Sequence, residues 1–194
     1  MNQRFQQVDF PYEQLLAIGY HSAFNGEKAP VISGMMLLPL KTRYRGPANP
    51  VVDQNETDII DEAINVFRPA LFYNQYKIKG EADRTLMYLF LYLIECCKQL
   101  HGMTNKNEAY RKLRDFAIQK SLPIPGEARF PLNDFFDPPK NSKEEETLQA
   151  YLTQMRQECG DRLVNTVFRH SETAADKHWT MFGKRRFINR CFNP

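Results

Sequence analysis

The chain has 194 residues, of which 42% are hydrophobic and 25% are charged. This length and composition favour one globular domain with a sizeable core, and they exclude a disordered chain. The formal net charge is only +3, and residues 169–194, with six Lys or Arg against Glu172 and Asp176, hold all of that excess. Any attraction to an acidic partner should therefore concentrate near the carboxyl terminus.

The amino-terminal residues and the cysteines indicate where the protein is found. The first residues contain no apolar segment of the kind found in secretory signals. The spacing of Cys96, Cys97, Cys159 and Cys191 fits neither a disulfide framework nor a zinc site. We therefore expect an intracellular protein with reduced thiols, in which residues 1–19 form an arm and residues 20–194 form a single helical domain.

The first regular pattern in chain order is an extended one. Residues 33–48 begin apolar and then alternate in polarity. This alternation places Lys41, Arg43 and Arg45 on one side of an extended segment. Two prolines then exclude regular structure directly after it.

Residues 58–67 are predicted to form the first helix, because their apolar side chains recur at helical spacing. Thr57 or Asp58 is expected to cap this helix at its start. Pro69 is expected to close it, because a proline disfavours helical backbone in the residue before it.

The most informative stretch covers residues 81–101. Residues 86–94 are nine apolar or aromatic residues in a row, and periodicity alone cannot distinguish a helix from a strand in such a run. Glu81 and Asp83 at the start and Lys98 at the end favour a helix, because they complement its dipole. A membrane span would need about 20 apolar residues. A helix without a polar face must be enclosed by other elements, and its central core side chains should be Leu86, Leu89, Phe90 and Leu93.

Three further helices are predicted after this one. Asn105 and Glu108 are spaced as at a helix start. The proline-rich segment 123–139 is predicted to be a long connection, and its phenylalanines are expected to pack it against the core. Ser142 and Glu145 form a capping box, and apolar residues recur at helical steps after them as far as Val167. A last helix over residues 178–190 is less regular.

No residue pattern indicates catalysis or cofactor binding. The chain has no P-loop, no dinucleotide-binding glycine motif and no HExxH motif. Cys97 and His101 are spaced to share one helix face, but two ligands are too few for a structural metal site. We therefore predict no catalytic, cofactor or metal site and no enzymatic activity.

The basic segment near the carboxyl terminus is the candidate for a surface role. It contains Lys184, Arg185, Arg186 and Arg190 next to Trp179. These cations could form a solvated face or bind an acidic protein partner, and nucleic acid is less favoured because no nucleic-acid-binding motif accompanies them. Our hypothesis for a partner-binding strip combines two groups of residues: Lys41, Arg43 and Arg45 with Lys184, Arg185, Arg186 and Arg190.

Several short motifs follow one another in a single order along the chain. They include Tyr20-His21-Ser22, Arg45-Gly46-Pro47-Ala48, Glu81-Ala82-Asp83-Arg84, Ile124-Pro125-Gly126-Glu127, Phe130-Pro131-Leu132-Asn133 and Trp179-Thr180. In this order the sequence resembles the family of subunit 3 of the actin-related protein 2/3 complex, which nucleates branched actin filaments. The resemblance extends over about residues 20–190.

The resemblance implies an all-α domain of about five helices, with the apolar helix enclosed by the others. It also implies a non-catalytic scaffolding subunit, without a cofactor, in the cytoplasmic actin cytoskeleton. Its partners would be the other subunits, chiefly the third actin-related protein, and indirectly actin filaments and nucleation-promoting factors. The alternative is a free-standing basic helical module that binds nucleic acid or an anionic membrane through its carboxyl-terminal segment.

Overall fold

A computed structural model describes residues 19–51, 53 and 55–192 of the chain. The predicted arm, residues 1–19, falls almost entirely outside the described residues and stays a prediction. The described elements are, in chain order, the 3-10 helix η1 (Ala23–Gly26), β1 (Val31–Ile32), β2 (Met35–Met36), α2 (Ile59–Ala70), α3 (Glu81–Leu100), α4 (Lys106–Ala117), the 3-10 helix η2 (Asn133–Phe135), α5 (Ser142–Val167), α6 (Lys177–Thr180) and the 3-10 helix η3 (Met181–Lys184).

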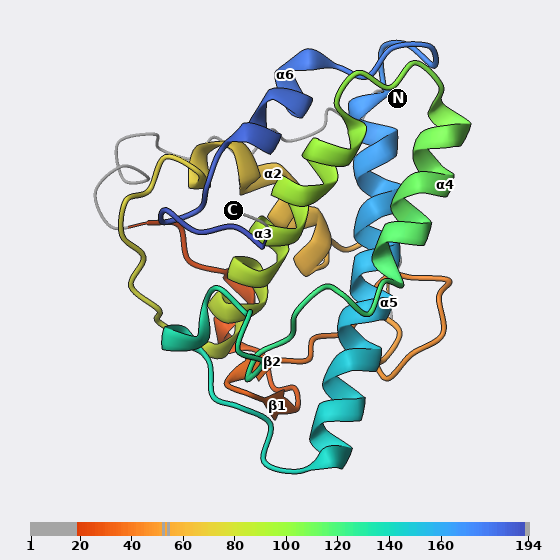
Figure 1. The fold of residues 1–194 in the computed structure, drawn as a ribbon. Helices are drawn as coiled ribbons and strands as arrows, with labels where there is room; N and C mark the ends of the chain where they lie inside the picture. The colour runs from red at the N-terminus through yellow and green to blue at the C-terminus, as the bar shows by residue number, and fades with distance from the viewer. Residues whose placement is uncertain (1–18, 52, 54, 193–194) are drawn as a thin grey trace, which may run out of the picture.

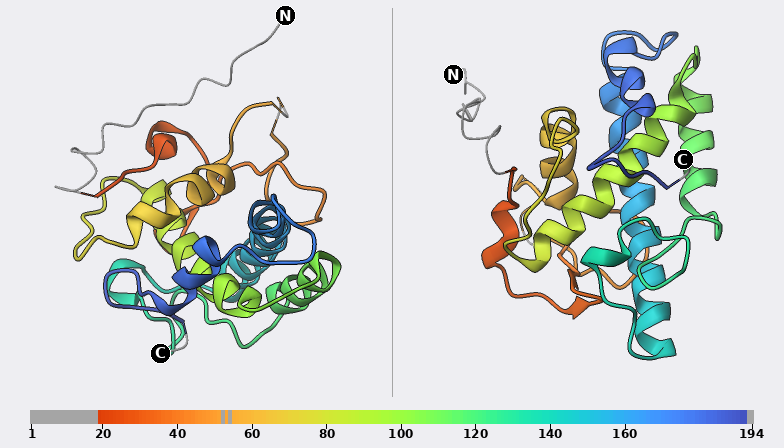
Figure 2. Two further views of the ribbon diagram at one scale, coloured as in Figure 1. Left: turned by 90° about the horizontal axis from the view of Figure 1, so that it is seen from above. Right: turned by 60° about the vertical axis from the view of Figure 1, so that its left-hand side comes forward.

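Helix α3 is the centre of the molecule and contacts α2, α4, α5, β2 and η3. Figures 1 and 2 show it running obliquely between α2 on one side and the pair α4 and α5 on the other. The four predicted core side chains have an exposed fraction of 0%: Leu86, Leu89, Phe90 and Leu93. The prediction that other elements enclose this apolar helix is therefore confirmed.

The prediction of a strictly all-α fold is wrong in one place. Strands β1 and β2 form a two-stranded antiparallel sheet in which Val31 pairs with Met36 and Ile32 with Met35. The turn between them is Ser33-Gly34, with φ of 56° and 74°, as the tightest hairpin turns require. Strands of two residues are too short to show an alternating pattern in the sequence. The fold is mostly helical, with this small hairpin against α3.

The ends of three helices differ from the predictions. Pro69 lies inside the last turn of α2 and does not close it, because Leu71 still donates to the Phe67 carbonyl. Asn141, one residue earlier than predicted, caps α5 by accepting a hydrogen bond from the Glu144 amide. No single helix covers 178–190: after α6 and η3 the chain turns back on itself at residues 188–189, which both have positive φ.

The long connection before α5 packs down on the core, as predicted. Phe130 and Phe136 are buried, and the ring of Phe130 stacks on Tyr88 of α3 with centroids 6.2 Å apart. None of the described helices combines the length and the apolar character needed to cross a membrane.

Candidate functional site

Two of the three basic residues of segment 41–45 form ion pairs within the molecule. Lys41 Nζ lies 2.6 Å from Asp61 Oδ2, next to the start of α2. Arg43 Nη2 lies 2.9 Å from Asp161 Oδ2 of α5, although its side chain is 69% exposed. Arg45 is exposed and forms no ion pair with any described residue. The segment forms no strand, and these ion pairs help to hold it against the rest of the domain.

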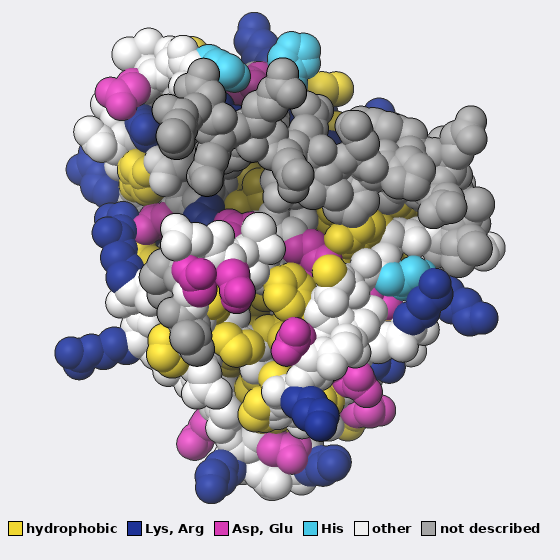
Figure 3. Space-filling model, turned by 180° about the vertical axis from the view of Figure 1, so that it is seen from behind, with side chains coloured by type: hydrophobic (Ala, Val, Ile, Leu, Met, Phe, Trp, Pro, Cys, Tyr) yellow, Lys and Arg dark blue, Asp and Glu magenta, His cyan; other side chains and the backbone are white. Residues whose placement is uncertain are grey.

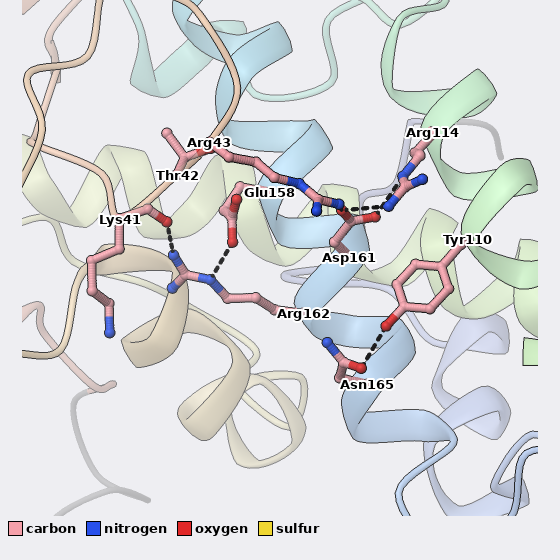
Figure 4. A pocket seen from close by; sticks show the side chains of 9 residues that line it. All are labelled: Lys41, Thr42, Arg43, Tyr110, Arg114, Glu158, Asp161, Arg162 and Asn165. Carbon is pink, nitrogen blue, oxygen red and sulfur yellow. Dashed lines mark hydrogen bonds and ion pairs between the residues drawn. The ribbon is translucent and has the colours of Figure 1, made fainter. Parts of the chain in front are cut away.

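Arg162 of α5 is the centre of this ion-pair network, as Figure 4 shows in part. Its guanidinium lies 2.6 Å from Asp58 Oδ1, 2.7 Å from Asp61 Oδ1 and 2.9 Å from Glu158 Oε1, and it also donates to the Lys41 carbonyl. Burial would lower the pKa of Arg162, but Asp58 and the other carboxylates outweigh it and raise that pKa. Arg162 therefore fixes segment 41–45 to α2 and α5.

Asp161 joins the same segment to α4. It accepts hydrogen bonds from Arg114, Arg43 and the Tyr44 hydroxyl. Burial favours the protonated acid, but the hydrogen bonds from Arg114 and Tyr44 prevail and hold the pKa of Asp161 below its usual value. Asp161 thus stays ionised between two guanidinium groups.

These pairs surround a cavity of about 630 Å³ between segment 41–43, α4 and α5. The lining residues are Lys41, Thr42, Arg43, Tyr110, Arg114, Glu158, Asp161, Arg162 and Asn165 (Figure 4). Its cations are balanced, because Asp58 and Asp61 next to the cavity and Glu158 and Asp161 in its wall pair with them. These ion pairs hold segment 41–43 to the neighbouring helices, and they leave no excess positive charge to attract an anion.

The carboxyl-terminal cations have a different environment. Lys184, Arg185 and Arg186 are exposed, and none of them forms an ion pair with a described residue. Arg190 is half-buried and paired: it bonds Asp134 and the Pro131 carbonyl in the loop around η2. The unpaired positive charge of the predicted strip is therefore concentrated at residues 184–186.

The structure does not bring the two groups of the predicted strip together. Segment 41–45 lies against α2, α4 and α5, whereas the chain after α6 crosses α3 and reaches the η2 loop (Figures 1 and 2). On the face shown in Figure 3, the described Lys and Arg side chains lie mostly around the edge, with hydrophobic and acidic ones between them. The basic residues form separate sites on the surface.

A buried polar network at the start of the described chain was missed by sequence reasoning. Glu62 accepts hydrogen bonds from the hydroxyls of Tyr20 and Ser22, each at 2.7 Å, and Asp83 bonds the Nδ1 of His21 at 2.9 Å. Residues 20–22 are thereby fixed to α2 and α3. In the sequence Asp83 indicated only a charge that complements the helix dipole, and no local pattern marks a carboxylate whose partners lie about 60 positions away.

The cysteines and histidines do not assemble into a metal centre in the part of the chain that the structure describes. Cys96, Cys97 and Cys159 are buried thiols outside any disulfide, and burial raises the pKa of Cys97 to about 12. His101 is exposed at the end of α3. These three thiols belong to the core.

Comparison with known proteins identifies the family. A family model described as "P21-Arc: ARP2/3 complex ARPC3 (21 kDa) subunit" matches residues 17–192. The chain belongs to the ARPC3 family. It is 42% identical over 172 residues to "Actin-related protein 2/3 complex subunit 3" of Schizosaccharomyces pombe, covering 88% of this chain and 97% of the relative.

Relatives from two other organisms carry the same subunit name. The chain is 40% identical over 174 residues to "Probable actin-related protein 2/3 complex subunit 3" of Caenorhabditis elegans, covering 88% of this chain and 93% of that protein. It is 39% identical over 173 residues to the subunit 3 of Dictyostelium discoideum, covering 88% and 98%. These names describe a subunit of the actin-related protein 2/3 complex, and they do not support a free-standing module that binds nucleic acid or membrane.

Proposed function

We propose that this chain is a scaffolding subunit of the actin-related protein 2/3 complex that packs chiefly on the third actin-related protein. Its relatives carry the name of that complex. Through this contact it supports the nucleation of branched filaments and the response to nucleation-promoting factors, in the cytoplasmic actin cytoskeleton. Nucleotide chemistry belongs to the actin-related subunits in this scheme.

The observation that carries the interface proposal is the contrast between paired and unpaired cations. Lys41, Arg43 and Arg190 already have carboxylate partners within the chain, so a partner protein would have to compete for them. Residues 184–186 have no such partner among the described residues and are exposed. We assign them the main electrostatic role in assembly, with Arg45 in a lesser one, because unpaired surface charges steer association with a complementary surface.

A double charge reversal tests this proposal. A tagged chain with Arg185→Glu and Arg186→Glu is expressed in cells, and the chains that co-purify are quantified by mass spectrometry. The recovery of both actin-related proteins should fall at least about tenfold relative to the wild-type chain, because like charges placed at an interface cost several kcal/mol.

The matched control is Arg111→Glu with Lys112→Glu. These two basic neighbours on α4 are also exposed and also lack an ion pair among the described residues. The control should assemble and support branching like the wild-type chain. Normal assembly and branching by the Arg185 and Arg186 variant would contradict the interface, and a wild-type chain that purifies without actin-related proteins would contradict the subunit role itself.

A further inference from the structure

A row of four aromatic rings connects the end of α2 to the carboxyl-terminal segment. Trp179 of α6 stacks on Phe67 of α2 with centroids 6.3 Å apart, and Phe182 of η3 meets Phe67 edge to face at 6.0 Å. Phe72, just after α2, meets Phe182 edge to face at 6.5 Å. These separations and angles are those of favourable aromatic pairs. Phe67 has no exposed surface, so it anchors the row in the core.

An arginine lies over the ring at each end of this row. The guanidinium carbon of Arg68 is 5.0 Å from the Trp179 ring centroid, and that of Arg185 is 5.3 Å from the Phe72 centroid. Both arginines are exposed and neither forms an ion pair with a described residue. Their flat guanidinium groups are held by cation–π contact, with their hydrogen-bond donors still available to a partner.

The row also has exposed apolar surface. Phe72 is 56% exposed and Met181, between Trp179 and Phe182 in the chain, is 50% exposed. A single exposed apolar side chain is common on a protein surface. Here two of them lie beside aromatic rings and arginines, and the interiors of protein interfaces are enriched in aromatic residues, Met and Arg. The combination is typical of a docking surface, whereas a solvated helix face would carry Lys and Glu.

The carboxyl-terminal half of this surface is held rigidly. A Cβ atom on Gly183 would lie 2.6 Å from the Lys98 amide nitrogen, so the backbone of η3 rests directly on α3. Four residues later, Phe187 is fully buried against Phe90 and Tyr76. A surface fixed in this way loses little conformational entropy when a partner binds.

We propose that Arg68, Phe72, Trp179, Met181, Phe182 and Arg185 form one docking face, the arginine–aromatic face, for a protein surface that presents an apolar side chain flanked by carboxylates. The apolar side chain would lie on Phe72 and Met181, and the carboxylates would meet the two arginines. The proposal rests on the proposed function, since it specifies the chemistry of the partner surface in the same complex. Charge complementarity favours this partner, because exposed cations at 68 and 184–186 lack carboxylate partners among the described residues.

The test is a competition between two versions of the chain in one cell. The wild-type chain and a Phe72→Glu variant are co-expressed with different tags, and their ratio in the purified complex is divided by their ratio in the lysate. We expect this quotient to favour the wild-type chain at least about tenfold, as for truncation of an interface hot spot. Ile118→Glu is the matched control, because Ile118 is also 56% exposed but follows α4. It should compete within about twofold of the wild-type chain.

A second variant separates docking from folding. Met181 is not among the side chains packed on the core, so Met181→Glu should leave the thermal unfolding midpoint of the full chain unchanged while lowering its share of the complex. A photo-crosslinking residue at position 72 should trap one protein segment of the complex that contains Asp or Glu beside an apolar residue.

Three results would overturn the docking face. They are equal competition by both the Phe72 and Met181 variants, crosslinks only to nucleic acid or lipid, and crosslinks only to residues 1–18 of the same chain. If the wild-type chain joins the complex in those experiments, the proposed function stands and only the docking face fails. If the wild-type chain itself is not recovered with the complex, the proposed function fails.

Discussion

At the scale of single residues, Asp83 shows how a carboxylate stays ionised inside this domain. Its side chain is fully buried, which alone would raise its pKa. Hydrogen bonds from the backbone amides of Lys79 and Ser22 and from the side chains of His21 and Asn25 outweigh burial and hold the pKa of Asp83 below its usual value. The charge therefore stabilises the native arrangement of residues 20–25 on α3.

This pKa predicts the response of the domain to acid. A carboxylate whose pKa is lower in the folded state contributes stability that is complete above its unfolded pKa, about 3.9, and is lost as the pH falls through the folded value. The free energy of unfolding in urea should therefore hold from pH 7 to pH 5 and decrease below about pH 4. Asp83→Asn should weaken this dependence, whereas Asp115→Asn, on the exposed surface of α4, should leave it intact. A stability independent of pH between 5 and 3 would contradict the prediction.

Leu89 tests the enclosure of α3 at one position. Its side chain has no exposed surface, so Leu89→Ala leaves a cavity that the surrounding helices fill only in part. The free energy of unfolding should fall by about 2–5 kcal/mol in chemical denaturation. Ile118→Ala, on the surface, should change it by less than about 0.5 kcal/mol. A loss at Leu89 as small as that at Ile118 would mean that α3 is not enclosed.

At the scale of elements, the contact between η3 and α3 depends on a missing side chain. Gly183 is buried, and its Cα approaches the backbone of Cys97 and Lys98 more closely than a Cβ atom permits. A helix backbone is not a flexible neighbour that can move aside. The close packing of η3 on α3 therefore depends on the absence of a side chain at Gly183.

Gly183→Ala should lift η3 from α3 and destabilise the domain by about 1–3 kcal/mol, as for an overpacked core. Gly26→Ala in η1 is the control, because no atom outside its two chain neighbours lies within 4 Å of its added Cβ, and it should change stability by less than about 0.5 kcal/mol. Thermal and urea unfolding of the full chain measure the stability of both variants. Equal stability of the two variants would show that η3 is loosely placed.

The elements that the sequence predicts well are those whose own residues decide their form. The apolar run of α3 and the helical stripe of α5 needed no information from elsewhere. The hairpin and the end of the chain were mispredicted for a different reason. Two-residue strands show no period, and the turn at Ile188 and Asn189 adopts positive φ values of 44° and 63° that a β-branched residue such as isoleucine rarely takes without tertiary support.

At the scale of the whole molecule, the distribution of charge could be predicted only in part. The excess of cations near the carboxyl terminus is visible in the sequence. The sequence does not reveal that Lys41 pairs with Asp61 or Arg43 with Asp161, 118 positions away. Ion pairs between distant segments follow from tertiary packing, which periodicity does not encode. For the same reason the aromatic row between α2 and η3 became visible only in the structure.

The covering of α3 by the carboxyl-terminal segment has a consequence for the synthesis of the protein on the ribosome. Phe187 packs on Phe90, and Phe192 packs on Tyr88. The ribosome makes α3 long before it makes these two phenylalanines, so a nascent chain carries an apolar helix that its later elements do not yet cover while translation continues. Such surfaces are where partly made chains aggregate or recruit chaperones. The complete covering of α3 therefore depends on residues that are translated late.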